Sequence, residues 1–332
     1  MVNIAIAGGT GELAREVIDA LLSSSTKHTI LILSRSSSTS TTNPHNLPFR
    51  QVDYSDLPAL ARVLADSDIH TVLSFIQLLH DPDNTSQKTL IKACIQAGVT
   101  RFAPSEYGGI PSPTSLLPGW QQKHALSSYL SSLRRNTPTL EYTLFRPSLL
   151  TNYLSPNPTS KHLTPLQTPF ISIPARRAVT IQDHDPYIVF TTAHDLARAV
   201  AFAVSYHQAP WPKVGGIRGQ RLRLSELIGV AERVTGQKFQ IETVKLKDLQ
   251  AGKWTASWRL EVSHPSASQG DPEAVEQMLK QVMIGILLGS VEGCWDVSDE
   301  WNKIIERQDK GFNFTGVEEF LKGTGVPLDS KV

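Results

Sequence analysis

The sequence predicts a doubly wound α/β fold, in which a parallel sheet is covered by helices on both faces. Between residues 1 and 150, short apolar runs alternate with segments in which apolar residues recur at helical spacing. The first run, residues 2–7, passes directly into a turn that contains Gly8 and Gly11. After residue 150 the alternation becomes less regular and prolines increase, so we expect a smaller, mainly C-terminal α/β lobe over residues 151–332.

The elements of the first domain, residues 1–150, follow from this alternation. Strands are expected at 2–7, 28–33, 49–54, 70–75, 101–105 and 141–146, and helices at 12–22, 57–65, 85–97 and 121–134. The polar, low-complexity segment 36–48 predicts a mobile loop or simple disorder.

The second lobe gives weaker but readable signals. We expect a strand at 187–192, a helix at 195–204 capped by Thr192 and Asp195, a helix at 224–234 ended by Gly236, a strand at 238–244, a helix at 272–288 interrupted by Gly285, and a short helix at 316–321. The prolines between residues 156 and 174 favour loops over a pocket.

The glycine turn after the first strand predicts a dinucleotide site of the Rossmann type. Glycines there let the backbone turn sharply and approach a pyrophosphate, and the small Ala14 lets the next helix pack closely on the strand. The N–H groups that begin this helix then face the phosphates. Glycine clusters are often plain turns, but here a strand precedes and a helix follows. Cofactor contacts are expected from Gly8, Thr10, Gly11, Glu12 and Leu13.

The tip of the second strand indicates which dinucleotide is bound. An acidic residue there would bind the ribose hydroxyls of NAD, but this chain has Ser34, Arg35 and Ser36. An arginine can fork onto a 2′-phosphate, so the sequence favours NADP(H); the alternative is that Arg35 is a solvated loop residue. Asp53, at the end of the next run, either flanks the adenine or marks the start of a helix.

Further contacts are expected where the remaining parallel strands end, because ligands of such sheets bind beyond the carboxyl ends of the strands. These positions carry Phe75, Gln77, Ser105 and Pro147.

The composition of the chain limits the classes of partner that it is expected to bind. The net charge is +1 and no long basic block occurs, which argues against nucleic acid as a partner. The two cysteines, Cys94 and Cys294, are far apart, and the histidines lack zinc-site spacing, so we expect a reducing compartment and no metal. Without a leader-like N-terminus or a long uninterrupted apolar run, we expect a cytoplasmic protein that binds no membrane, as a monomer or homodimer.

Lys123 is the main candidate for chemistry. It precedes Leu126 by three residues and Leu130 by seven, which places it on or beside the inward-facing stripe of its helix. An ammonium at the edge of a core needs polar partners, and the nicotinamide ribose and a reacting oxygen are suitable ones. The alternative is a solvated lysine whose long side chain reaches water.

Five motifs together resemble the isoflavone reductase-like, or NmrA-like, group of atypical short-chain dehydrogenases. They are IAIAGGTGELA at 4–14, LSR at 33–35, RFAPSEYGG at 101–109, KHALSSYL at 123–130 and YTLFRPS at 142–148. The resemblance covers the first 150 residues well and the rest thinly. It implies a reductase that moves a hydride from NADPH to a conjugated, phenolic or polyketide-like aromatic metabolite, with Lys123 as the acid/base or oxyanion-stabilising group.

The chain departs from ordinary short-chain dehydrogenases at one important position. Their catalytic tyrosine stands four residues before the lysine, where this chain has Gly119. Tyr107 is the nearest substitute by location; it stands where the resembled group usually has phenylalanine, and its ring either takes part in proton transfer or only packs against the nicotinamide. Substrate contacts are expected from Trp120, Tyr153, Phe170 and Tyr187, with ordinary core packing as the alternative for each.

Two other functions remain open. The same group includes non-catalytic proteins that bind NADP(H) and sense its redox state, which would fit the missing tyrosine. The fold also serves isomerases and carbonyl reductases. Lys123 beside the predicted nicotinamide site favours a reductase over both.

Overall fold

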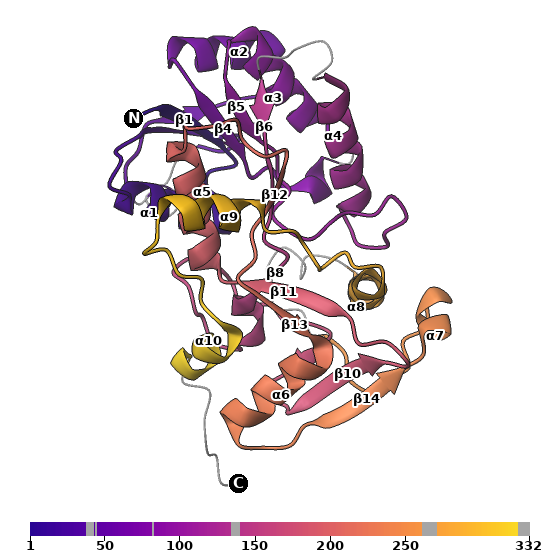
Figure 1. The fold of residues 1–332 in the computed structure, drawn as a ribbon. Helices are drawn as coiled ribbons and strands as arrows, with labels where there is room; N and C mark the ends of the chain where they lie inside the picture. Colours follow the sequence, from indigo (N-terminus) through magenta and orange to yellow (C-terminus); the bar gives the residue numbers. More distant parts are fainter. Residues whose placement is uncertain (38–42, 44, 82, 134–139, 261–270, 325–332) are drawn as a thin grey trace.

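Six parallel strands form the central sheet of the computed structural model, which describes residues 1–37, 43, 45–81, 83–133, 140–260 and 271–324. They are β1 (Asn3–Ala7), β2 (Thr29–Ser34), β3 (Phe49–Gln51), β4 (Thr71–Ser74), β5 (Arg101–Ala103) and β6 (Glu141–Tyr142), arranged in the order β3-β2-β1-β4-β5-β6 (Figure 1). The order reverses between β1 and β4, which is where a Rossmann sheet opens a crevice for its ligand. The predicted fold class is confirmed.

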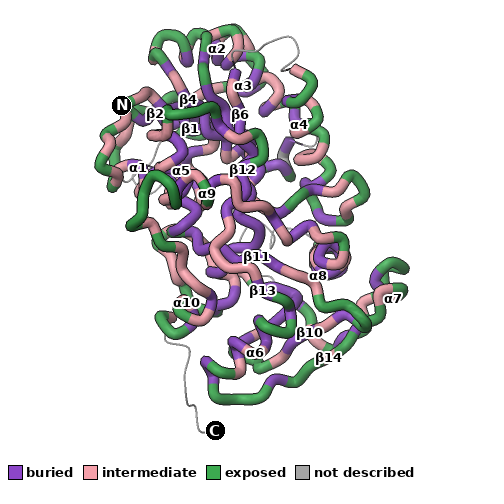
Figure 2. The backbone as a smooth tube through the Cα atoms, in the orientation of Figure 1, coloured by how far each residue is buried: buried purple, intermediate pink, exposed green. Residues whose placement is uncertain are grey.

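Helices cover both faces of this sheet because successive side chains of each strand point to opposite faces. Ile4 and Ile6 of β1 pack toward α1 (Glu12–Ser23) and α5 (Ala193–Ser205), whereas Ala5 and Ala7 pack toward the opposite layer. That second layer consists of α2 (Leu57–Asp66), α3 (Thr85–Gln96) and α4 (Trp120–Leu133). The buried positions of these elements form the purple interior of the upper half of Figure 2.

The second lobe adds two small sheets and several helices below the main sheet (Figure 1). One sheet joins β8 (Leu149–Leu150), β11 (Tyr187–Thr191) and β13 (Gln220–Arg223), and the other joins β9 (Ile171–Ser172), β10 (Arg177–Ile181) and β14 (Gln240–Val244). The helices of this part are α6 (Leu224–Thr235), α7 (Leu246–Gln250), α8 (Pro272–Val291) and α10 (Val317–Gly323), and two 3₁₀ turns, Leu78–His80 and Thr151–Leu154, connect other elements.

Three elements from the second half of the sequence pack on the first half. Helix α5 lies against α1, β12 (Val214–Gly216) pairs in parallel with β7 (Leu144–Arg146), and α9 (Glu300–Gln308) covers β12. The side chains of α5 and α9 share one apolar cluster with β1 and β2. The division of the chain at residue 150 stays a prediction.

Most expected elements occur within a few residues of their predicted bounds, and the differences have local causes. The Thr192 hydroxyl does accept from the N–H of Asp195, at 3.0 Å, and Gly236 does end α6 with φ +65°. The prediction that Gly285 interrupts a helix is wrong: α8 continues through it. A Cβ at Gly285 would lie 2.9 Å from Cγ of Leu117, so glycine permits close packing there.

Other differences concern short elements. The third strand ends at Gln51, since residues 52–54 form no ladder, and α7, α9, β10, β12 and β13 were not anticipated. Arg134, and residues 38–42 and 44 of the low-complexity segment, lie outside the described residues.

Within the described part of the chain, one helix, α8, is long and apolar enough to cross a membrane by length and composition, although polar residues interrupt its apolar run. The test uses length and composition alone, and core helices of water-soluble proteins also meet it; 33% of its apolar window is buried. The same described part holds no group of three or more histidine, cysteine or acidic residues arranged to bind a metal.

Candidate functional site

The turn after β1 has the geometry of a phosphate cradle. Gly8 adopts φ +72°, and a Cβ there would lie 2.8 Å from the backbone oxygen of Phe75, so only glycine fits between the ends of β1 and β4. The Gly8 N–H donates to Leu33 O at 2.9 Å, and the Gly11 N–H donates to Gly8 O at 3.0 Å. Helix α1 begins directly after Gly11 without a side-chain cap, so its first N–H groups stay available to an anion. These residues fit a dinucleotide pyrophosphate.

The adenosine end of the predicted site lies at the tips of β2 and β3. Ser34 is buried and its hydroxyl accepts from the Ser36 N–H at 3.3 Å, while Arg35 is exposed. Gln51 donates to the backbone oxygen of Arg35 at 2.9 Å, which ties this tip to β3. An exposed guanidinium on a fixed backbone is suited to a phosphate ester on the ribose.

Asp53 is exposed and its carboxylate accepts from the N–H and the hydroxyl of Ser55, at 2.8 and 2.7 Å. These bonds lower the pKa of Asp53. The helix start that follows is capped instead by Asp56, which accepts from the N–H of Ala59 at 2.9 Å. Asp53 therefore shapes the loop before α2 and is not the N-cap of that helix.

An aromatic stack lies beside the carboxyl ends of β4 and β5. The rings of Phe75 and Tyr107 lie 4.4 Å apart at 7°, and Tyr107 lies 6.1 Å from Phe145. The Tyr107 hydroxyl is buried without a hydrogen-bond partner among the described residues, and burial raises its pKa. A phenol in this environment stays protonated and has a hydrogen bond left to offer to a ligand.

Gln87 forms hydrogen bonds at the carboxyl ends of two neighbouring strands, β4 and β5. It is fully buried, and its Oε1 accepts from the N–H of Ser105 at 2.9 Å and from the hydroxyl of Ser74 at 3.2 Å. Its Nε2 is buried without a partner among the described residues. Gln77 is exposed before a 3₁₀ turn, and Pro147 is buried, with its oxygen accepting from the hydroxyl of Thr191 at 2.8 Å.

Lys123 points inward from the first turn of α4. Its Nζ donates to the backbone oxygen of Glu106, in the loop after β5, while Leu126 and Leu130 on the same stripe are buried. A Cβ at Gly108 would lie 3.1 Å from this Nζ, so the glycine leaves room for the ammonium. Burial lowers the pKa of Lys123; the positive charge of Arg146 lowers it further, and the negative charge of Glu106 opposes both. An amine in this setting can give up a proton more readily than a lysine in water.

Glu106 and Arg146 are site residues that the motif analysis did not assign. Glu106 Oε2 accepts from Nε and Nη2 of Arg146 at 3.3 and 3.4 Å, and Oε1 is buried without a partner. Burial raises the pKa of Glu106, opposed by the nearby charges of Lys123 and Arg146. Both residues lie inside quoted motifs, but 40 positions separate them, so spacing alone gave no sign of the pair.

The position of the missing tyrosine is structurally unsuited to a side chain. Gly119 adopts φ +82° immediately before α4, and a Cβ there would lie 3.4 Å from Cβ of Leu78. A tyrosine at this position would have a strained backbone and would precede the first residue of the helix. The departure at Gly119 is therefore built into the turn.

The four predicted substrate residues fall into two groups. Trp120 packs edge-on against Trp295 at 4.8 Å, and Tyr153 joins Phe75, Tyr107 and Leu163 in one apolar cluster. Tyr153 also lines an apolar recess of about 150 Å³ that is closed by Pro165, Leu166 and Ile173, among others. Trp120 is buried in the core cluster of the second lobe, whereas Tyr153 is partly buried beside the aromatic rings of Phe75 and Tyr107, and their contact with a substrate stays a prediction.

Phe170 and Tyr187 have structural surroundings instead. Phe170 has no exposed surface and packs in the core of the second lobe. The ring of Tyr187 is covered by the guanidiniums of Arg221 and Arg223, centred 3.3 and 4.3 Å away. Phe170 is enclosed and the Tyr187 ring is stacked with two arginines, so these surroundings favour the packing alternative, and a substrate contact by either ring stays a prediction.

A segment of the proline-rich loop is bound along α1. Thr164 donates to Glu12 at 2.6 Å, the N–H of His162 to Glu16 at 2.7 Å, and Lys161 to Asp19 at 2.8 Å. The three acceptors follow one face of the helix whose start forms the phosphate cradle. Glu12, predicted to contact the cofactor, is thus engaged by the loop.

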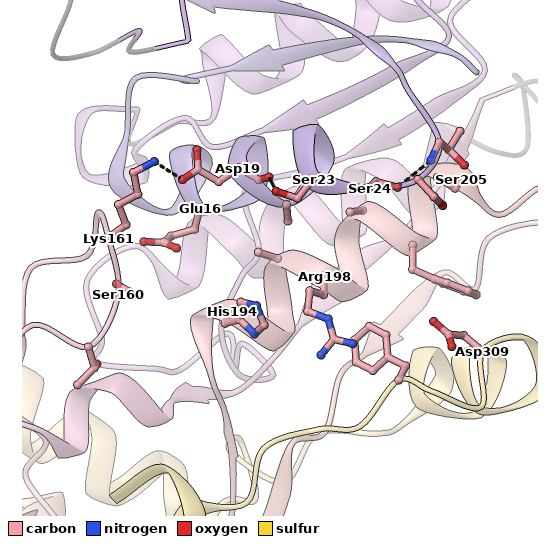
Figure 3. A pocket seen from close by; sticks show the side chains of 18 residues that line it. Glu16, Asp19, Ser23, Ser24, Ser160, Lys161, His194, Arg198, Ser205 and Asp309 are labelled. Atoms are coloured by element: carbon pink, nitrogen blue, oxygen red, sulfur yellow. Dashed lines mark hydrogen bonds and ion pairs between the residues drawn. The ribbon is translucent and has the colours of Figure 1, made fainter. Parts of the chain in front are cut away.

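Beyond this segment lies a hollow of about 830 Å³ between α1 and α5. Figure 3 shows Lys161 reaching Asp19 on one side, while on the other the Arg198 guanidinium lies 3.9 Å from the centre of the Phe312 ring. Neither α4 nor the loop after β5 lines this hollow.

Comparison with known proteins identifies similar chains. A model of the NmrA-like family matches residues 2–321. The oxidoreductase BOA1 of Botryotinia fuckeliana (strain B05.10) is 31% identical over 246 residues, which cover 72% of this chain and 78% of that protein. The oxidoreductase swnN of Metarhizium robertsii (strain ARSEF 23 / ATCC MYA-3075) is 28% identical over 276 residues, which cover 77% of this chain and 80% of that protein.

Two solved structures share the fold. A new type of NADPH-dependent quinone oxidoreductase (QOR2) from Escherichia coli has 22% identity and a TM-score of 0.64, covering 97% of this chain and 99% of its own. The ternary complex of leucoanthocyanidin reductase from Vitis vinifera has 17% identity and a TM-score of 0.65, covering 98% and 99%. At these identities the likeness establishes a common architecture, which extends over both lobes.

Proposed function

This chain belongs to the NmrA-like family, and from that premise we propose that it is an NADPH-dependent reductase acting on a conjugated, phenolic or polyketide-like aromatic metabolite. The observation that carries the proposal is the ammonium of Lys123, which is held inward by Glu106 O beside the strand ends that carry the aromatic stack. The names of the curated relatives, all oxidoreductases, and of the NADPH-dependent structural neighbours support it.

Some of these residues would bind the coenzyme, and others would take part in the reaction or enclose the substrate. The turn from Gly8 to Gly11 and the start of α1 would hold the pyrophosphate, and Arg35 would bind the 2′-phosphate. NADPH, when bound, supplies the hydride. The Lys123 ammonium would donate to the substrate oxygen on which negative charge develops, and a donor fixed in place before the reaction stabilises that charge. Phe75, Tyr107 and Tyr153 would exclude water from a flat apolar substrate.

The direct test is NADPH oxidation by the purified protein with panels of quinones, enones and phenylpropanoid-like acceptors. We expect net consumption with at least one class, and with NADPH deuterated at C4 the label should appear on substrate carbon. Label that fails to reach the product would point to an isomerase, and label on a carbinol carbon would point to a carbonyl reductase.

A non-catalytic NADP(H) sensor is the second candidate, because Gly119 removes the usual proton donor. This alternative predicts tight binding of NADPH and no consumption with any acceptor, together with an unchanged affinity when Lys123 is replaced. The acceptor panel therefore separates the two functions.

Arg35→Ala is expected to raise the KM for NADPH by about ten- to a hundredfold, since one charge-assisted contact to a phosphate contributes roughly 1.5–3 kcal/mol. The KM for NADH should change little, because NADH lacks the 2′-phosphate. Steady-state kinetics with both coenzymes measure the effect, and Arg50→Ala, on the exposed part of the neighbouring β3, is the matched control. An equal rise in KM for both coenzymes would mean that Arg35 supports coenzyme binding without contacting the 2′-phosphate.

A further inference from the structure

Two Arg–Glu ion pairs join β5 and the loop after it to residues 141–146, one near each end of that segment. At the amino end, Arg101 Nε donates to Glu141 Oε2 at 3.1 Å. At the carboxyl end, Arg146 Nε donates to Glu106 Oε2 at 3.3 Å. The two pairs have opposite orientations: the arginine lies on β5 in the first pair and on β7 in the second.

The two carboxylates differ in exposure. The Glu141 side chain is 31% exposed, so water completes its hydration, whereas the Glu106 side chain is 0% exposed. Glu106 Oε1 is also buried without a partner among the described residues. A buried ion pair gains little stability unless its remaining acceptors are satisfied, so bracing two strands does not account for Glu106.

Glu106 differs from Glu141 in a second respect, because its own backbone oxygen accepts from Nζ of Lys123. Arg146 holds the carboxylate from β7 while Lys123 approaches the carbonyl from α4, so the residue lies between two cations. Moving or neutralising Glu106 would therefore change both the place and the charge of the lysine.

We propose that Glu106, clamped by Arg146, is a positioning residue for Lys123: its carbonyl directs the ammonium into the crevice, and its enclosed carboxylate keeps that ammonium protonated. The inference deepens the proposed reductase function and rests on it for its catalytic meaning. The surrounding charges agree with it. Among the described residues, the charge of Glu106 raises the pKa of the Lys123 amine and the charge of Arg146 lowers it, and His124 on α4 also acts on Glu106.

Glu106→Gln tests the proposal because it keeps the shape and removes the charge. The pKa of Lys123, read from the pH dependence of acetic anhydride labelling at its amine, should fall by about one unit or more, as expected when an opposite charge nearby is lost. In the reductase assay, the alkaline decline of kcat/KM should move to lower pH by the same amount. A protonated lysine is required, so the activity is present below its pKa and disappears as pH rises through it. Glu106→Asp, which keeps the charge, should bring both midpoints most of the way back to the wild-type values.

Glu141→Gln is the matched control, since it breaks the equivalent pair near the other end of residues 141–146. It is expected to lower thermal stability and to leave both pH midpoints unchanged. An unchanged labelling midpoint in Glu106→Gln, or the same shift in Glu141→Gln, would overturn the inference.

Should Glu106→Gln fail to fold, the double variant Glu106→Gln/Arg146→Gln replaces it, because no lone charge is then left buried. Its labelling midpoint should lie below that of Arg146→Gln alone, which keeps the carboxylate, and a midpoint at or above that of Arg146→Gln rejects the inference. Labelling needs no turnover. Absence of NADPH oxidation in the wild type would therefore count against the proposed function alone.

Discussion

Replacing Lys123 with alanine is expected to reduce kcat with a quinone or enone acceptor by about a hundredfold or more while leaving NADPH binding intact. Loss of one preorganised donor to a developing oxyanion typically costs a factor of about 10²–10³ in rate. The lysine lies on α4 and contacts the loop after β5, whereas the phosphate cradle is formed by the β1 turn and α1. The affinity for the coenzyme should therefore survive the substitution.

The measurement pairs steady-state kinetics with a fluorescence titration of NADPH binding. Lys88→Ala on the neighbouring helix α3 is the control, since its Nζ donates to the backbone oxygen of Asp83 at the surface. We expect this variant to keep the wild-type kcat. A Lys123→Ala protein that retains half of the wild-type kcat would remove the lysine from the mechanism and leave a nucleotide-binding scaffold.

The parts of the site that depend on local rules were predictable from the sequence. A glycine turn needs only a strand before it and a helix after it, and both were visible around Gly8. The inward direction of Lys123 followed from its spacing to Leu126 and Leu130, because helical periodicity fixes which side chains share a face. The constraint at Gly119 was visible as a departure, although its cause, a left-handed backbone, was not.

The parts that depend on contacts between distant segments were not predictable. Glu106 meets Arg146 because β6 pairs with β5 and leads into β7, and no periodicity links charges 40 residues apart. The aromatic character of Tyr187 suggested a ligand contact, but two arginines from β13 cover the ring, and that pairing follows from strand register. Sequence patterns identify the face that a residue occupies, and the fold decides what it meets there.

The same limit explains why α9 escaped detection, and it leads to the largest expected effect on stability. Trp301 of α9 is fully buried among Phe145, Trp211 and Tyr206, with ring centres 5.9, 6.1 and 6.1 Å away. Its indole N–H donates to the hydroxyl of Thr143 at 3.4 Å. One tryptophan thus anchors a helix from the end of the chain onto the strands that lead into the site.

Trp301→Ala is expected to lower the free energy of unfolding by about 3–5 kcal/mol, the usual cost of emptying a large aromatic site in a packed core. Equilibrium denaturation in urea measures it, and Trp258→Ala, at a partly exposed position of the second lobe, should cost much less. Because α9 covers β12 and β12 pairs with β7, the strand that carries Arg146, the loss should extend to the site. In the protein that remains folded, the alkaline decline of kcat/KM that depends on Lys123 should be less pronounced. A Trp301→Ala protein as stable as the wild type would mean that α9 is a peripheral addition, and the anchoring of β7 would have to come from β6 alone.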